Sequence, residues 1–122
     1  MIFQPSMKKI LAARGYHHCK TDDEFTRHGN HARNIQYAFS KEFHRNHETI
    51  VDIVFLGADM AGEKLVIGFF RENVSIKNGI MESSDVSIPL SKFSLAEFEK
   101  QLDKLIRKGN PFRTGVDGGE SF

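Results

Sequence analysis

The chain contains 122 residues, of which 39% are apolar and 27% charged, so it has the size and composition of one globular domain. This composition excludes a disordered or collagen-like chain, and no apolar run approaches the roughly 18 residues that a membrane-spanning helix requires. The net charge of +1 is far from the strongly basic balance of dedicated nucleic-acid-binding domains. The single cysteine allows no internal disulfide, and lysines 8 and 9 precede any long apolar stretch, unlike a signal peptide. We therefore expect a cytoplasmic protein without membrane contact.

The first predicted element is a helix over residues 4–14. Met7, Ile10 and Leu11 recur at helical spacing and share one face. Gly15 follows at the position where a left-handed residue commonly ends a helix.

The residues that follow predict strands. The strand candidates are residues 16–20, 24–27, 35–43, 50–56, 64–70, 74–77, 80–81 and 86–90. The nearly continuous apolar runs 50–56 and 64–70 are typical of central strands. Asn78-Gly79 is a strong two-residue hairpin signal, residues 21–23 are a second candidate turn, and Pro89 predicts that the last strand lies at a sheet edge or ends there.

The last predicted element is a helix over residues 95–108. Ser94 and Glu97 have the spacing of a capping box, and Phe93 and Phe98 that of a hydrophobic staple. The apolar stripe of this helix consists of Leu95, Phe98, Leu102, Leu105 and Ile106.

This order of elements predicts the α+β class, because strands follow one another without alternating helices. We expect a single curved antiparallel sheet of about five or six strands, with an N-terminal and a C-terminal helix packed on one of its faces. Residues 1–112 form one domain in this interpretation, and the glycine-rich residues 113–122 form a flexible tail.

Basic and aromatic residues alternate in residues 25–45, which we call the basic aromatic segment. Aromatic rings can stack on bases while cations contact phosphates, so this segment is a candidate nucleic-acid-binding or partner-binding surface. The aromatic side chains could equally form the inner face of a sheet. The candidate binding residues are Arg27, Arg33, Tyr37, Lys41 and Arg45.

Two His-x-Asn-His sequences make a metal site the weaker alternative. They supply His28, His31, His44 and His47. Residues 32–43 between them read as strand, and an extended strand of about 3.3 Å per residue would hold the two pairs far apart. We therefore expect no metal ion and no other cofactor.

The function predicted from these features is protein binding. The runs 50–56 and 64–70 are apolar at both odd and even positions, so both faces of the sheet need a cover. Two short helices on one face leave the second face to a protein partner or a second copy of the chain. No catalytic constellation is apparent. We expect a small non-enzymatic accessory protein of the inhibitor, immunity or adaptor type, and the alternative is a nucleic-acid-binding regulatory protein that uses the basic aromatic segment.

Overall fold

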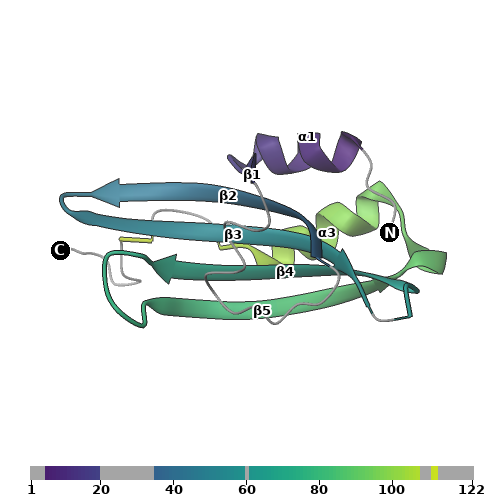
Figure 1. The fold of residues 1–122 in the computed structure, drawn as a ribbon. Coiled ribbons are helices and arrows are strands. Elements are labelled where there is room, and N and C mark those ends of the chain that lie inside the picture. Colours follow the sequence, from purple (N-terminus) through teal and green to yellow (C-terminus); the bar gives the residue numbers. More distant parts are fainter. Residues whose placement is uncertain (1–4, 20–34, 60, 108–110, 113–122) are drawn as a thin grey trace.

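A computed structural model describes residues 5–19, 35–59, 61–107 and 111–112. In chain order the elements are α1 (Pro5–Ala13), β1 (His17–Cys19), β2 (Ile35–Arg45), β3 (Glu48–Ala58), β4 (Lys64–Asn73), β5 (Ile80–Pro89), the 3₁₀ turn η1 (Leu90–Lys92) and α3 (Leu95–Leu105). The five strands form one antiparallel sheet in the order β1-β2-β3-β4-β5 (Figure 1). The structure therefore confirms the predicted α+β class.

The two helices are close to their predicted positions. α1 covers Pro5–Ala13, and Gly15 beyond it has the positive φ of 89° expected of a residue that ends a helix. α3 begins after Ser94, whose hydroxyl accepts a hydrogen bond from the Glu97 backbone N–H, so the predicted N-cap is confirmed. α3 ends at Leu105 rather than 108 because Ile106 has an extended backbone.

The strand predictions need more correction. β3 and β4 extend the predicted runs 50–56 and 64–70, and β3 is the central strand of the sheet. Residues 80–81 and 86–90 were predicted as separate strands, but most of them belong to the single strand β5, which is the last strand of the sheet and ends at Pro89 as expected. Residues 74–77 lie in the loop before β5 and not in a strand. The predicted segments 21–23, 24–27 and 113–122 lie outside the described residues.

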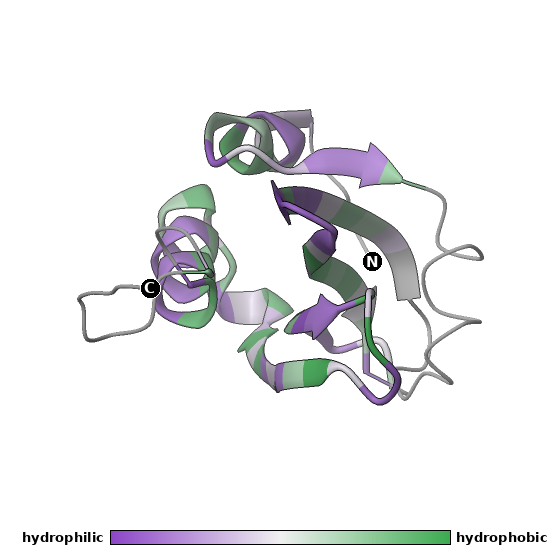
Figure 2. Ribbon diagram, turned by 90° about the vertical axis from the view of Figure 1, so that its left-hand side faces the viewer, coloured by the Kyte–Doolittle hydropathy of each residue, from purple (hydrophilic) through white to green (hydrophobic). Residues whose placement is uncertain are grey.

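Both helices pack on the same face of the sheet, as expected (Figure 2). Phe39, Val54 and Phe69 are register partners on β2, β3 and β4, and all three are fully buried on this face. The helix residues buried in the same core cluster are Met7 and Leu11 of α1 and Phe98, Leu102 and Leu105 of α3.

The opposite face of the sheet carries a second apolar cluster, formed by Ala38, Val51, Ile53, Phe55 and Phe70. We expected a partner to cover this face, and this expectation is wrong. Each of these side chains is at most 9% exposed in the single chain. Val54 and Leu56 on the helix face are also fully buried. Apart from the partly exposed Val66, the large apolar side chains of β3 and β4 are therefore buried on both faces.

One contact in the second cluster depends on a missing side chain. Gly68 of β4 is the register partner of Phe55 of β3, and the Phe55 ring lies where a Cβ atom at position 68 would stand. The ring thus fills the space that glycine leaves open, and it covers the backbone of the neighbouring strand.

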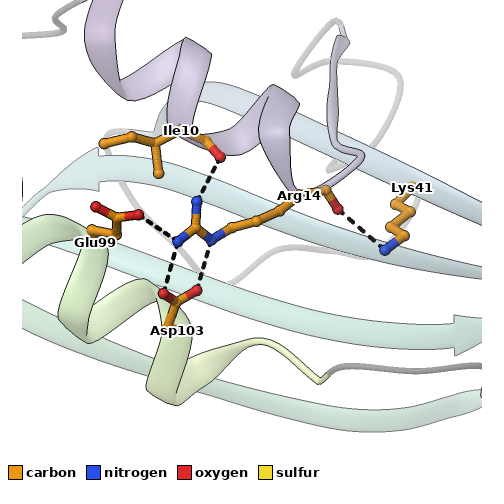
Figure 3. Close-up of polar contacts among 5 residues, drawn as sticks. All are labelled: Ile10, Arg14, Lys41, Glu99 and Asp103. Carbon is orange, nitrogen blue, oxygen red and sulfur yellow. Dashed lines mark hydrogen bonds and ion pairs between the residues drawn. The ribbon is translucent and has the colours of Figure 1, made fainter.

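Arg14, just beyond α1, joins the two helices (Figure 3). Its guanidinium group donates to both carboxylate oxygens of Asp103 at 2.6 and 2.7 Å and to Glu99 at 2.6 Å. The guanidinium group also donates a hydrogen bond to the backbone carbonyl of Ile10 at 3.0 Å. The hydrogen bonds with Asp103 are the largest cause of a raised pKa for Arg14. Because one planar group contacts α1 and two turns of α3, it fixes how the helices lie together.

We predict that Leu102→Ala lowers the free energy of unfolding by about 2–5 kcal/mol, because Leu102 is fully buried between α3 and the sheet. Urea unfolding measures this loss. Lys100→Ala, at an exposed position of the same helix, is the matched control and should change stability by less than about 0.5 kcal/mol. A loss below about 1 kcal/mol for Leu102→Ala would contradict the docking of α3.

Candidate functional site

Four large apolar side chains are exposed at the end of the sheet where β4 turns into β5. They are Val74 (37% exposed), Ile76 (56%), Ile80 (50%) and Met81 (49%), and we call them the hairpin patch. In the described part of the chain these are the large hydrophobic residues left open to solvent. The β4–β5 connection lies at the end of the sheet remote from α1 (Figure 1).

The loop that carries the hairpin patch is held in place by hydrogen bonds. The Val74 N–H donates to the Thr49 carbonyl at 3.0 Å, and the Thr49 N–H donates to the Ser75 hydroxyl at 2.7 Å. At the base of the loop, the Asn73 N–H donates to the Gly79 carbonyl at 2.8 Å. These bonds tie the loop to the start of β3, so Ile76 is presented on an ordered backbone.

Asn78 and Gly79 close this loop, for identifiable reasons. Asn78 has a positive φ of 57°, which asparagine tolerates better than most residues. A Cβ atom at position 79 would collide with the Asn73 carbonyl oxygen, so this position requires glycine. The Asn78-Gly79 signal therefore marks a real turn, although the loop spans residues 74–79 rather than two residues.

The hairpin patch continues into β5, whose outer edge has no further strand beside it in the described part of the chain. Most β5 side chains are exposed, and the strand is ten residues long. The other edge of the sheet is β1, which has only three residues. A long edge with free backbone groups, next to apolar side chains, can pair with an extended segment of another protein.

A second feature is a buried ion pair on the helix face of the sheet. Arg71 of β4 donates to both oxygens of Asp52 of β3 at 2.6 and 2.8 Å, and the two residues are register partners. The Asp52 side chain is fully buried. The hydrogen bonds with Asp52 are the main cause of the raised pKa of Arg71. The Arg71 guanidinium also lies 5.9 Å from the centre of the Phe43 ring.

Tyr16, between α1 and β1, is buried close to this pair. Its hydroxyl is out of contact with solvent and has no hydrogen-bond partner among the described residues. Burial is the main cause that raises the pKa of Tyr16, and the charge of Asp52 raises it further, while Arg71 lowers it. A neutral phenol is therefore held beside an ion pair whose two charges offset each other.

The structure places three of the five predicted binding residues, and all three contact their own chain. Lys41 donates to the Arg14 carbonyl at 3.1 Å and lies over the rings of Tyr16 and Phe43. Tyr37 packs against the main core. Arg45 lies 4.6 Å from the centre of the Phe112 ring and also pairs with Glu48. The remaining two, Arg27 and Arg33, lie outside the described residues.

The structure describes two of the four candidate metal-ligating histidines. His44, near the end of β2, contacts Thr49 at 3.1 Å and Glu42 at 3.2 Å, and it is exposed. His47 lies in the turn between β2 and β3. Within the described residues no group of three or more His, Cys, Asp or Glu side chains is arranged to hold a metal ion. His28 and His31 lie outside the described residues, so their distance from His44 stays a prediction.

Comparison with protein-family models, curated proteins and solved structures finds no match. The candidate site therefore rests on its own geometry. Among the described residues, no helix is both long and apolar enough to cross a lipid bilayer.

The hairpin patch was missed at the level of sequence because its residues resemble ordinary strand residues. Val74 and Ile76 alternate with polar residues before Asn78-Gly79, and Ile80 and Met81 follow directly. The sequence signal that could have revealed the patch is that its apolar residues occur singly or in a pair, whereas those of β3 and β4 form long runs. Short apolar pairs beside a turn have few neighbours to bury them.

We predict that Asp52→Leu lowers the free energy of unfolding by about 3–5 kcal/mol, because it leaves Arg71 buried without its partner. The double variant Asp52→Leu/Arg71→Met should recover most of this loss in urea unfolding, since apolar residues of similar size replace the whole pair. Arg107→Ala breaks the exposed ion pair with Glu82 and should lose less than about 1 kcal/mol. Additive losses in the double variant would contradict the coupling of Asp52 and Arg71.

We predict that Tyr16→Phe raises stability at pH 7 by about 1 kcal/mol, because the buried hydroxyl loses its hydration without gaining a hydrogen bond. The effect should grow above pH 10. A tyrosine in the unfolded chain ionises near pH 10, whereas Tyr16 in the fold has a raised pKa and stays neutral there. A rise in pH above 10 therefore favours the unfolded chain and lowers the stability of the parent protein, and Tyr16→Phe removes this loss.

The measurement is urea unfolding of both proteins between about pH 7 and pH 11. Tyr37→Phe, at the second tyrosine of the chain, is the control and should keep the alkaline loss that Tyr16 causes. Parallel stability curves for Tyr16→Phe and the parent protein would contradict the environment described for Tyr16.

Proposed function

We propose that this chain is a small non-enzymatic accessory protein, of the inhibitor, immunity or adaptor type, that acts by binding another protein. The observation that carries the proposal is the hairpin patch, in which four large apolar side chains in and beside one loop are each exposed. Burying them against a partner would remove apolar surface from water, which is the main favourable contribution to protein association.

The surroundings of the hairpin patch support a protein partner. Ser75, Lys77 and Asn78 are exposed polar residues of the same loop, which gives an apolar centre with a polar rim. Because the loop is already ordered by its bonds to Thr49, little conformational entropy would be lost on binding.

The nucleic-acid-binding alternative has less support. Of its candidate residues, Lys41 is hydrogen-bonded to Arg14, and Tyr37 is packed against the core. A base or phosphate would have to displace these contacts. Arg45 is the most exposed of the three described residues, and it already pairs with Glu48.

Single residues support two further parts of the proposal, namely that the chain is not an enzyme and that it is cytoplasmic. Asp52, the most deeply buried carboxylate among the described residues, is bound at both oxygens by Arg71 and is therefore a poor general base. The single cysteine, Cys19, supports a reducing compartment such as the cytoplasm.

We predict that the double variant Ile76→Ser/Ile80→Ser loses at least about 90% of partner capture, since these are the two most exposed residues of the hairpin patch. The measurement is quantitative cross-linking and mass spectrometry from native lysate, with partners defined by their recovery with the parent protein. Lys100→Ser/Lys104→Ser, on the exposed side of α3, is the matched control and should retain capture.

Equal capture by parent protein and patch variant would contradict the proposal. Recovery of nucleic acid instead, with retention on heparin that falls steeply with added salt, would favour the alternative. Urea unfolding of the patch variant shows whether a loss of capture comes from a loss of folding.

A further inference from the structure

We infer that the outer edge of β5 pairs with an extended strand of a partner protein, and that this strand carries a lysine or arginine opposite Asp85. The inference rests on the proposed function and deepens it, because it names the part of the fold that recognises the partner and the chemistry of what is recognised.

The outer edge of β5 has few of the features that usually protect a sheet edge, and its middle has only acidic charges. Proteins block long edges with charged side chains, especially lysine, with proline or bulges, or by keeping the strand very short. β5 runs for ten residues, about 33 Å at 3.3 Å per residue, and contains no lysine. Its proline, Pro89, is its last residue, and its one register shift lies at its first residues, opposite Arg71 and Glu72. Among the described residues, no strand pairs with the middle of this edge.

The side chains in the middle of β5 are three serines, two acids and Val86, which packs against the main core. Ser83, Ser84 and Ser87 are exposed and would not obstruct a neighbouring strand. Glu82 is paired with Arg107 at 2.8 Å. Asp85 is exposed and stands opposite Gly68 on β4, which has no side chain to pair with it. Asp85 therefore supplies the charge that an incoming strand would meet.

The position of this charge argues against a second copy as the occupant. Asp85 lies at the middle of β5, so antiparallel pairing of two copies along the whole strand brings the two Asp85 carboxylates to neighbouring positions. Like charges on adjacent strands are destabilising. A partner strand with a basic residue at its centre would instead be attracted.

The Ile80 end of β5 offers a place for apolar side chains of the partner, because the hairpin patch lies there. A strand that runs along the edge would thus meet apolar contacts at one end and Asp85 at its centre, which defines its pattern.

The test uses three synthetic peptides of ten residues. The first alternates valine and serine and has a single lysine at its centre, the second has glutamate in place of that lysine, and the third is the lysine peptide with N-methylated backbone amides. Binding is measured by NMR titration of the full chain, and hydrogen exchange is measured for the β5 amides that do not bond to β4. Asp85→Lys and Ser87→Lys are compared with the parent protein, because Ser87 is an exposed position of the same strand.

We expect the lysine peptide to slow exchange of these β5 amides and to bind about tenfold more tightly than the glutamate peptide. Asp85→Lys should reverse this preference, and Ser87→Lys should only weaken it. The N-methylated peptide should not bind, because it cannot form the backbone hydrogen bonds of a strand pair.

Three results would overturn the inference. The first is unchanged exchange of the β5 amides at millimolar lysine peptide. The second is binding that Ile76→Ser/Ile80→Ser abolishes but that neither Asp85→Lys nor N-methylation affects, in which case the hairpin patch binds proteins without strand pairing and the proposed function stands. The third is a concentration-dependent dimer in sedimentation with protected β5 amides, which identifies a second copy as the occupant. Failure of the proposed function is recognised separately, by partner capture that survives in the patch variant.

Discussion

The buried ion pair between Asp52 and Arg71 fixes the register of the two central strands, and the packing on both faces depends on that register. In most antiparallel sheets the alternation of apolar and polar residues selects one register, because a slip of one residue exposes the apolar set. β3 is apolar at both parities, so alternation alone does not penalise such a slip. The buried charge of Asp52 does penalise a slip, because only the observed register places Arg71 directly opposite it. The pair contributes specificity in addition to whatever it contributes to stability.

The helices and the hairpin patch occupy different parts of this sheet. α1 and α3 are joined by Arg14 and cover the helix face, where Phe39, Val54 and Phe69 form the centre of the core. The patch lies at the end of the sheet remote from α1, on a loop fixed by Thr49 and Ser75 (Figure 1). Because the loop is held by the start of β3 rather than by the helices, a partner could bind there without disturbing the helix core.

The parts of the fold that the sequence predicts are those determined by local chemistry. Ser94 caps α3 through a bond to a residue three positions away, and Pro89 ends β5 because it has no N–H to donate. The features that were missed depend on contacts between distant residues. Asp52 stands out in its apolar run, but its partner Arg71 is identified only once the register is known. The loop before β5 was predicted two residues long because its bond from Val74 to Thr49 joins residues 25 positions apart. The apolar second face was assigned to a partner, whereas its side chains are buried within the chain.

The contact between Phe55 and Gly68 has a consequence for how this sequence can change. The phenyl ring occupies the volume that a side chain at position 68 would need, so the two positions share one space on the second face of the sheet. A larger residue at position 68 is tolerated only if position 55 becomes smaller at the same time, and a smaller residue at 55 leaves a void unless 68 fills it. The two positions are therefore expected to covary: in related sequences, a larger side chain at one position should accompany a smaller side chain at the other, so that the sum of the two volumes stays nearly constant.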